Sequence, residues 1–116
     1  MIKTSILTTP LGWRSMWIVV LFDLPTETKA QRRHHAQFRK SLLKDGFSMM
    51  QYSVYKRHCA NRENTKVHIE RIGKLVPSEG EVRFLQITDR QYGDMKIFVG
   101  KKREAPEEPP AQLEFF

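Results

Sequence analysis

The chain has 116 residues and a mass of 13.7 kDa, which is enough for one small domain with a single core. Apolar residues make up 40% of the chain and charged residues 28%, and this composition excludes a disordered or fibrous protein. The longest uncharged apolar run, Met16–Phe22, is far shorter than the ~20 residues that span a bilayer, and Cys59 is the only cysteine. A membrane channel and a disulfide scaffold are therefore excluded as well.

Positive charge dominates most of the chain. Twenty Lys and Arg residues oppose 13 Asp and Glu residues, which gives a net charge of +7 and a pI of about 9.8. Residues 104–116 contain four glutamates and no basic residue, so residues 1–103 carry twenty basic against nine acidic residues, a net +11. A body this basic attracts polyanions such as nucleic acids. The alternative is a solvated basic surface with no single partner.

The N-terminal residues carry no credible secretory signal. The apolar run is too short, begins after residue 15 and is closed by Asp23, not by a small-residue cleavage site. Together with the single cysteine, this predicts a cytoplasmic location. Residues 1–15 show no regular period and are interpreted as a leader, with Met16 as an alternative start.

A strand and a helix are expected first. Met16–Phe22 is apolar at every position, which predicts a strand buried on both faces of a sheet. A helix is predicted over Thr26–Lys44, with Thr28 and Gln31 forming a capping box and Asp45-Gly46 ending it. Two helices cover only one face of a sheet in a chain this small, so a second copy of the chain is expected to cover the other.

The two sides of this helix differ in charge. With residues placed 100° apart, Gln31, His35, Phe38 and Leu42 share one side. The opposite arc holds six cations and no acid: Lys29, Arg32, Arg33, Arg39, Lys40 and Lys44. Like charges weaken an isolated helix, and a duplex backbone beside them would reverse that cost. An ordinary solvated face is the alternative interpretation.

The later elements complete an α+β pattern. A second strand is predicted over Phe47–Tyr55, with a bulge near Met50 and Gln51 and a basic extension through Lys56, Arg57 and His58. A second helix follows over Asn61–Val76, with Ile69, Ile72 and Val76 facing inward, and further strands over Val82–Thr88 and Met95–Val99, with a turn between them. Residues 100–110 read as a linker and Gln112–Phe116 as an apolar tail.

These strands and helices are interpreted as the ferredoxin-like β-α-β-β-α-β arrangement, in which an antiparallel sheet carries both helices on one face, with an extra C-terminal strand. The predicted organisation is a leader over 1–15, the ferredoxin-like domain over 16–103, and an acidic, Pro-rich linker with a docking strand over 104–116.

Most familiar catalytic motifs are absent from the sequence. It contains no GxxxxGK[ST], GxGxxG or GxSxG pattern. The histidine spacing matches no zinc site, and His34 and His35 would point about 100° apart on a helix. Cys59 is interpreted as a buried apolar residue. The strand VRFLQIT lacks the aromatic signature with which RNA-recognition motifs stack bases, so contacts with the nucleic-acid backbone are favoured.

Asp23 is the carboxylate with the most informative position, because it ends the first strand. A charge at the end of a buried strand requires hydrogen bonds, a counter-ion or a metal. Two such carboxylates from symmetry-related chains would suit one Mg²⁺, and the ion would activate water against a phosphodiester. The alternative is structural, since Asp-Leu-Pro-Thr is also a good turn sequence.

Three segments carry a family resemblance: MWIVVLFDLPTET (16–28), QRRHHAQFRKSLLKDGFSMMQYSVYKR (31–57) and ITDRQYGDMKIFVGKK (87–102). The chain resembles CRISPR-associated protein two, the small subunit of the spacer-acquisition machinery, and is most similar to its type II branch. The resemblance covers nearly all of residues 16–116, whereas residues 1–15 depart from the pattern.

The resemblance implies a homodimer in antiviral defence. In this family the dimer bridges two dimers of the integrase, CRISPR-associated protein one, and supports double-stranded prespacer DNA. The C-terminal strand, with Leu113, Phe115 and Phe116, would join a partner sheet or dock on the integrase. Arg32 and Arg33 match the basic positions after the Asp-x-Pro turn. The full set expected to contact nucleic acid is Lys29, Arg32, Arg33, Arg39, Lys40, Lys56 and Arg57.

The family also carries a metal-dependent endonuclease assignment, toward RNA or double-stranded DNA. Its proposed Mg²⁺ ligand, and hence its catalytic residue, matches Asp23, while the preceding position, often Tyr in the family, is Phe22 here. Two hypotheses follow for this chain. One is a non-catalytic bridge that binds duplex DNA, and the other is a Mg²⁺-dependent phosphodiesterase.

Overall fold

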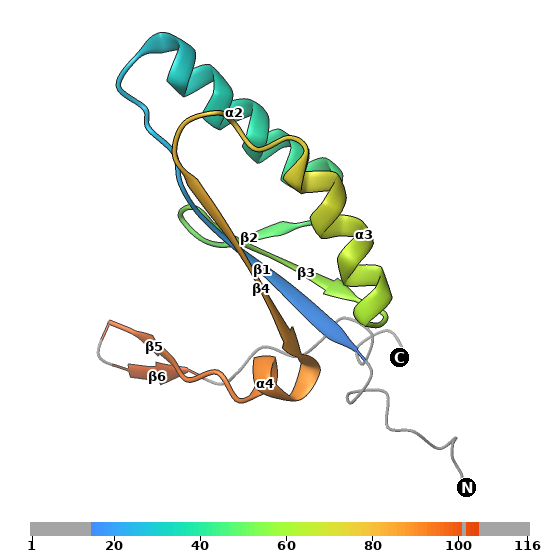
Figure 1. Ribbon diagram of the computed structural model, residues 1–116. Helices are drawn as coiled ribbons and strands as arrows, with labels where there is room; N and C mark the ends of the chain where they lie inside the picture. Colours follow the sequence, from blue (N-terminus) through green and yellow to red (C-terminus); the bar gives the residue numbers. More distant parts are fainter. Residues whose placement is uncertain (1–14, 101, 105–116) are drawn as a thin grey trace, which may run out of the picture.

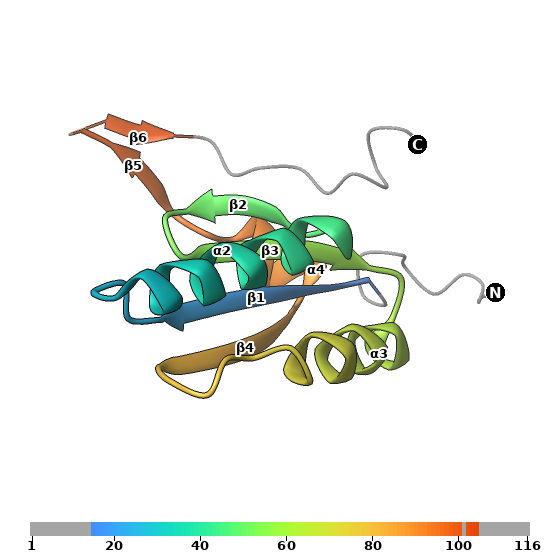
Figure 2. The same cartoon turned by 90° about the horizontal axis from the view of Figure 1, so that it is seen from above.

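The computed structural model describes residues 15–100 and 102–104 (Figure 1). In chain order the elements are β1 (Met16–Asp23), α2 (Lys29–Lys44), β2 (Ser48–Gln51), β3 (Val54–Cys59), α3 (Arg62–Gly73), β4 (Glu81–Thr88), α4 (Asp89–Gly93), β5 (Ile97–Val99) and β6 (Lys102–Glu104). Four of the strands form one sheet in the order β2-β3-β1-β4, with every neighbouring pair antiparallel. Figure 2 shows α2 and α3 lying together over one face of this sheet. The predicted ferredoxin-like α+β architecture is confirmed.

The core lies between the sheet and the two long helices. Alternate residues of β1 face the helices and are buried: Met16, Ile18, Val20 and Phe22. Phe38 and Leu42 of α2 and Ile72 of α3 pack on them, with Ile69 and Val76 partly buried at the margin. The inward-facing positions predicted from helical spacing are therefore confirmed, and the cations of α2 are left on its outer side.

Both ends of α2 follow their sequence signals. The Thr28 hydroxyl accepts the backbone N–H of Gln31 at 3.1 Å, and the Gln31 side chain accepts the N–H of Thr28 at 3.0 Å, so the predicted capping box is present. At the other end Gly46 adopts φ +94°, and the N–H of Phe47 donates back to Leu42 O at 3.0 Å. The left-handed conformation required there explains the glycine.

The segment predicted as one strand over 47–55 is a hairpin. β2 and β3 are joined by Tyr52 and Ser53, and Ser53 adopts φ +64°. The pairing register shifts between Met49 and Gln51, which confirms the predicted bulge. This hairpin supplies the fourth strand of the main sheet. The later strand β5 pairs instead with β6 in a separate two-stranded sheet, and β6 falls within the segment predicted as linker.

The residues after β4, predicted as a turn, form the short helix α4 with Thr88 as its N-cap. Tyr92 of α4 stacks on Trp17 of β1, with ring centroids 3.8 Å apart and planes 6° apart, and both side chains are buried. Val19 is buried as well, whereas Leu21 on the same face is 39% exposed. The expectation that a second chain buries the whole outer face is therefore wrong for the first half of β1, which is buried within its own chain.

Several predictions concern residues outside those described. The docking residues Leu113, Phe115 and Phe116, and the leader up to residue 14, lie there. Ser15, the last residue of the predicted leader, is buried, and its carbonyl accepts the N–H of Asp89 at 3.0 Å. Among the described residues, no helix has the length and apolar character needed to cross a membrane.

Candidate nucleic-acid interface and carboxylate site

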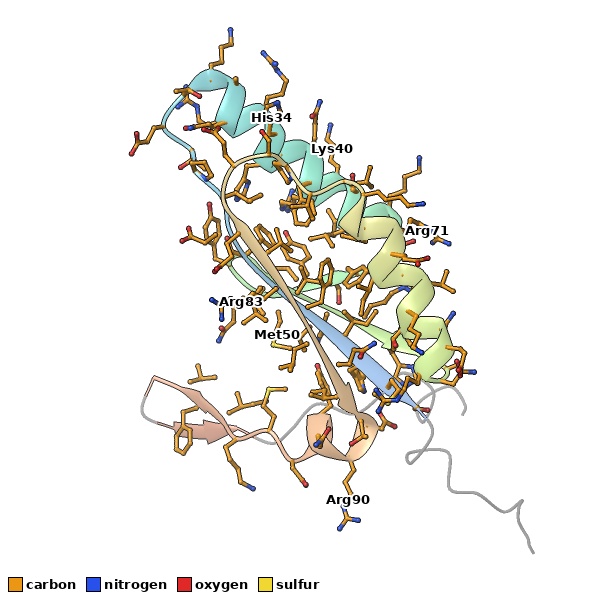
Figure 3. All side chains as sticks on the ribbon, in the orientation of Figure 1. His34, Lys40, Met50, Arg71, Arg83 and Arg90 are labelled. Atoms are coloured by element: carbon orange, nitrogen blue, oxygen red, sulfur yellow. The ribbon has the colours of Figure 1, made fainter. Side chains whose placement is uncertain are left out.

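The outer side of α2 is a continuous cationic face. We use the name α2 cationic face for its six exposed cations: Lys29, Arg32, Arg33, Arg39, Lys40 and Lys44. In Figure 3 the labelled side chains of His34 and Lys40 point away from the sheet. Within the described ranges, none of the six lies within ion-pair distance of a carboxylate. This face therefore carries positive charge that the neighbouring structure does not neutralise.

Two of these cations also brace the protein. The Nη1 of Arg32 donates to the carbonyls of Thr26 at 3.1 Å and Glu27 at 2.9 Å, which fixes the approach to α2. The Nε of Arg39 donates to Tyr55 Oη at 2.7 Å. A guanidinium has five N–H groups, so each arginine retains donors that can reach a phosphate. The other four cations of the face are held by no hydrogen bond within the residues described.

The two predicted binding residues on β3 lie apart from this face. Lys56 and Arg57 point to opposite faces of the sheet because side chains alternate along a strand. The ammonium of Lys56 lies 5.9 Å from the centroid of the Tyr92 ring. Arg57 is half-buried, and its Nε donates to Asp45 O at 2.7 Å while Nη1 donates to His58 O at 2.8 Å. Arg57 thus holds β3 to the end of α2, and contact between either residue and nucleic acid stays a prediction.

Asp45 joins the two long helices, a role that the sequence interpretation missed. Its side chain is largely buried, and its Oδ2 lies 2.7 Å from His68 Nδ1 on α3. Its Oδ1 accepts a hydrogen bond from Arg71 Nη1. A carboxylate at a helix C-terminus is disfavoured by the helix dipole unless a cation compensates it. The Asp45-Gly46 helix end was therefore a signal that a basic partner would lie nearby.

Asp23 ends β1 on the face turned away from the helices. By strand alternation it lies on the face opposite Phe22, and its register partner is Glu81 of β4. Glu81 is bonded to Arg83, with oxygen–nitrogen distances of 3.1 and 3.2 Å, and Figure 3 shows Arg83 on the same side of the sheet. Asp23 is exposed, so the cost of a charge at the end of a buried strand does not arise there. Solvent satisfies the carboxylate, and burial alone therefore does not require a metal there.

The carboxylates suit Mg²⁺ in chemical type. Register partners on one face lie about 5 Å apart at Cβ, and Mg²⁺ is commonly held by one or two carboxylates with water filling its other positions. Asp23 and Glu81 satisfy that requirement, although Arg83 competes for Glu81. In the described part of the chain no three His, Cys, Asp or Glu side chains gather as a ready metal site. The residues present therefore fit a water-rich Mg²⁺ site and do not form a closed cage.

A second polar cluster lies at the opposite end of β1. The Nε1 of Trp17 donates to Asp89 Oδ1 at 2.6 Å, and His58 Nε2 lies 3.7 Å from that oxygen without a hydrogen-bond partner in the described structure. Burial lowers the pKa of His58; Asp89 opposes this effect and Arg57 reinforces it. The neighbouring Cys59 is buried as predicted, and burial raises the pKa of its thiol, which makes it a poor nucleophile.

Comparison with known proteins decides the family. Residues 16–95 match the family model described as CRISPR associated protein Cas2. The chain belongs to the Cas2 family. It is 57% identical over 101 residues to the CRISPR-associated endoribonuclease Cas2 of Parvibaculum lavamentivorans, covering 87% of this chain and all of that protein. The protein of the same name from Flavobacterium psychrophilum is 52% identical over 104 residues, 90% of each chain. The predicted resemblance to this CRISPR-associated family is confirmed.

Proposed function

We propose that this Cas2-family chain is the DNA-binding, bridging subunit of CRISPR spacer acquisition. In this proposal a homodimer holds double-stranded prespacer DNA and connects dimers of the integrase, CRISPR-associated protein one. The observation that supports it is the α2 cationic face, where six exposed cations share one helix surface without a balancing carboxylate. A phosphate backbone supplies the missing negative charge, and its contacts are independent of base sequence.

Apolar side chains support the homodimer part of the proposal. Leu21 and Leu85 lie on the sheet face away from the helices and are 39% and 50% exposed. Figure 1 shows the β5–β6 hairpin projecting on that side, and its Phe98 and Val99 are 64% and 59% exposed. Burying these groups against a second chain would remove apolar surface from water and leave both α2 cationic faces outward.

Assembly with the integrase tests the bridging role. Deleting residues 111–116 removes Leu113, Phe115 and Phe116. We expect the truncated chain to keep its affinity for duplex DNA and to lose co-elution with the integrase in size-exclusion chromatography. Normal co-elution of the truncated chain would contradict the proposed docking strand. Unchanged duplex binding serves as the control for folding of the truncated protein.

A Mg²⁺-dependent endoribonuclease is the second candidate. It is supported by the carboxylates of Asp23 and Glu81 on an exposed strand end and by the name of the relatives, CRISPR-associated endoribonuclease Cas2. A bound Mg²⁺ would generate the hydroxide that attacks a phosphodiester. Asp23 would hold the ion through a carboxylate oxygen, with Glu81 beside it on β4.

The Asp23→Asn variant separates the two candidates. We expect it to lose RNA cleavage and to retain duplex binding, because strand alternation places Asp23 on the sheet face turned away from α2. Asp94→Asn, which changes another exposed carboxylate, is the matched control and should cleave normally. Undiminished cleavage by Asp23→Asn would assign the activity to another site. Retained spacer acquisition in cells carrying Asp23→Asn would identify bridging as the main function.

A further inference from the structure

An exposed aromatic side chain lies at the end of the sheet where β1 ends. Tyr52, in the turn between β2 and β3, is 80% exposed. Its ring stacks on His35 of α2, with centroids 6.3 Å apart and planes 22° apart. His35 in turn contacts Phe22 of β1, with ring centroids 5.7 Å apart. The three rings form a series that begins in the core at Phe22 and ends in solvent at Tyr52.

The backbone holds Tyr52 in this outward position. The next residue, Ser53, adopts φ +64°, a conformation that is disfavoured for residues other than glycine. The carbonyl of Ser53 accepts the N–H of Phe22 at 3.0 Å, which fastens the turn to the end of β1. Strained backbone conformations persist where the surrounding structure fixes them and are concentrated at functional sites. The turn is therefore a rigid support that presents an aromatic ring to solvent.

We propose that Tyr52 is a stacking platform for one unpaired nucleobase of a single-stranded nucleic acid. His35 backs one side of the ring, and the exposed remainder of the ring is available to a base. Every base has an aromatic face, so this contact tolerates any sequence. The site is distinct from the sheet surface that RNA-recognition motifs use. It deepens the ribonuclease candidate, on which it rests for its substrate class.

Charged groups beside the platform suit the rest of the nucleotide strand. Arg32 and Arg39 lie three residues before and four residues after His35 on α2, so both are its neighbours on the helix surface. Arg39 is held by the bond from its Nε to Tyr55, which leaves its Nη groups to bind a phosphate. Asp23 follows Phe22, the residue that contacts His35, but its side chain lies on the other face of the sheet, so a strand would pass around the end of β1 to reach it. Figure 2 shows the end of β1, the β2–β3 turn and the start of α2 at one end of the molecule.

The test compares a short oligoribonucleotide with an abasic ribose-phosphate strand of the same length, in the presence of a chelator that prevents cleavage. We expect the wild-type protein to bind the base-containing strand ~5- to 150-fold more tightly than the abasic strand. Tyr52→Ala should bind both strands with the same affinity, whereas Tyr52→Phe, the matched control, should discriminate as the wild type does. Because Tyr52 is 80% exposed, neither variant should lower the midpoint of thermal unfolding.

A second measurement identifies the stacked base. With 2-aminopurine placed at each position of the oligoribonucleotide in turn, at least one position should be quenched by wild type and Tyr52→Phe but not by Tyr52→Ala. Discrimination retained by Tyr52→Ala would overturn the proposal. A Tyr52→Ala variant that no longer forms a dimer but still prefers the base-containing strand would also overturn it, because the ring would then serve a contact between protein chains. If Asp23→Asn still cleaves RNA while Tyr52→Ala loses discrimination, the ribonuclease assignment to Asp23 fails and the platform stands.

Discussion

Neutralising two cations of the α2 cationic face should change DNA binding and protein stability in opposite directions. Arg33 and Lys40 are exposed and form no ion pair within the described ranges. Each has a like charge four residues away on the helix surface, Lys29 for Arg33 and Lys44 for Lys40. The double variant Arg33→Gln/Lys40→Gln therefore removes two phosphate-binding groups and two repulsive helix pairs, without removing packing in the core.

The expected magnitudes follow from these contacts. Each like-charge pair at this spacing destabilises a helix by ~0.2–0.5 kcal/mol, so the free energy of unfolding should rise by roughly 0.4–1 kcal/mol at low salt. Each lost phosphate contact lowers the magnitude of the slope of log affinity against log salt by ~0.9, so this magnitude should fall by up to about 1.8 per chain, or about 3.6 when both chains of a dimer contact the duplex. A variant that is more stable but binds duplex DNA more weakly cannot owe its weaker binding to unfolding.

The assay is fluorescence anisotropy of a labelled duplex over a series of salt concentrations, combined with urea denaturation. Lys66→Gln/Lys74→Gln on and beside α3 is the matched control, because it removes the same charge from a surface that also carries Glu63 and Glu70. The control should keep the wild-type salt slope. If both double variants reduced the slope of log affinity against log salt equally, DNA binding would depend only on net charge. That result would refute the assignment of binding to α2.

Two further predictions concern stability. Burial lowers the pKa of His58 below its ordinary 6.5, so the unfolded chain takes up a proton before the folded chain does. The free energy of unfolding should therefore fall as pH drops from 6.5 toward the lowered pKa. His58→Gln should flatten this part of the plot of unfolding free energy, measured by urea denaturation, against pH. A plot identical to that of the wild type would contradict the assignment. Thr28→Ala removes the hydroxyl that caps α2 and should cost about 1 kcal/mol in the same assay, while Thr28→Ser should retain most of the stability. An equal loss in both variants would show that the cap does not act through its hydroxyl.

Local chemistry made much of the fold predictable. The apolar run of β1, the capping box at Thr28 and the glycine at position 46 each specify their own structure with little help from distant residues. The spacing of Phe38 and Leu42 identified the buried side of α2, and the opposite side of the helix was thereby identified as the cationic face. Each of these signals is contained within a few neighbouring residues, and the tertiary contacts reinforce it.

The missed features depend on contacts between distant residues or on unusual backbone. The β2–β3 turn contains Tyr52 and Ser53 in place of Gly, Asn, Asp or Pro, and Ser53 adopts its positive φ where the Phe22 N–H fastens its carbonyl. Trp17 is covered by Tyr92, which lies 75 positions later, so no local pattern around either residue indicates their stacking. For α4 a signal did exist, because Thr88 and Gln91 have capping-box spacing, but the nearby Gly93 favoured a turn.

In the candidate site too, the features set by local sequence were predictable and those set by distant residues were not. Asp23 was identifiable because it ends an apolar strand, whereas its exposure and its pairing with Glu81 depend on how β1 and β4 are aligned. The separation of Lys56 and Arg57 onto opposite faces follows from strand alternation, which the sequence interpretation did not apply beyond Tyr55. Arg57 donates to the backbone carbonyl of Asp45, so the type of side chain at position 45 does not indicate this contact.

The central claim is that two copies of this chain present their cationic helices to one nucleic-acid duplex. Sedimentation velocity of the full chain, alone and with a short DNA duplex at low ionic strength, tests it most directly. The account predicts a species of twice the 13.7 kDa chain mass when free, and a complex that contains two chains per duplex. A 13.7 kDa species that sediments separately from the duplex would contradict it.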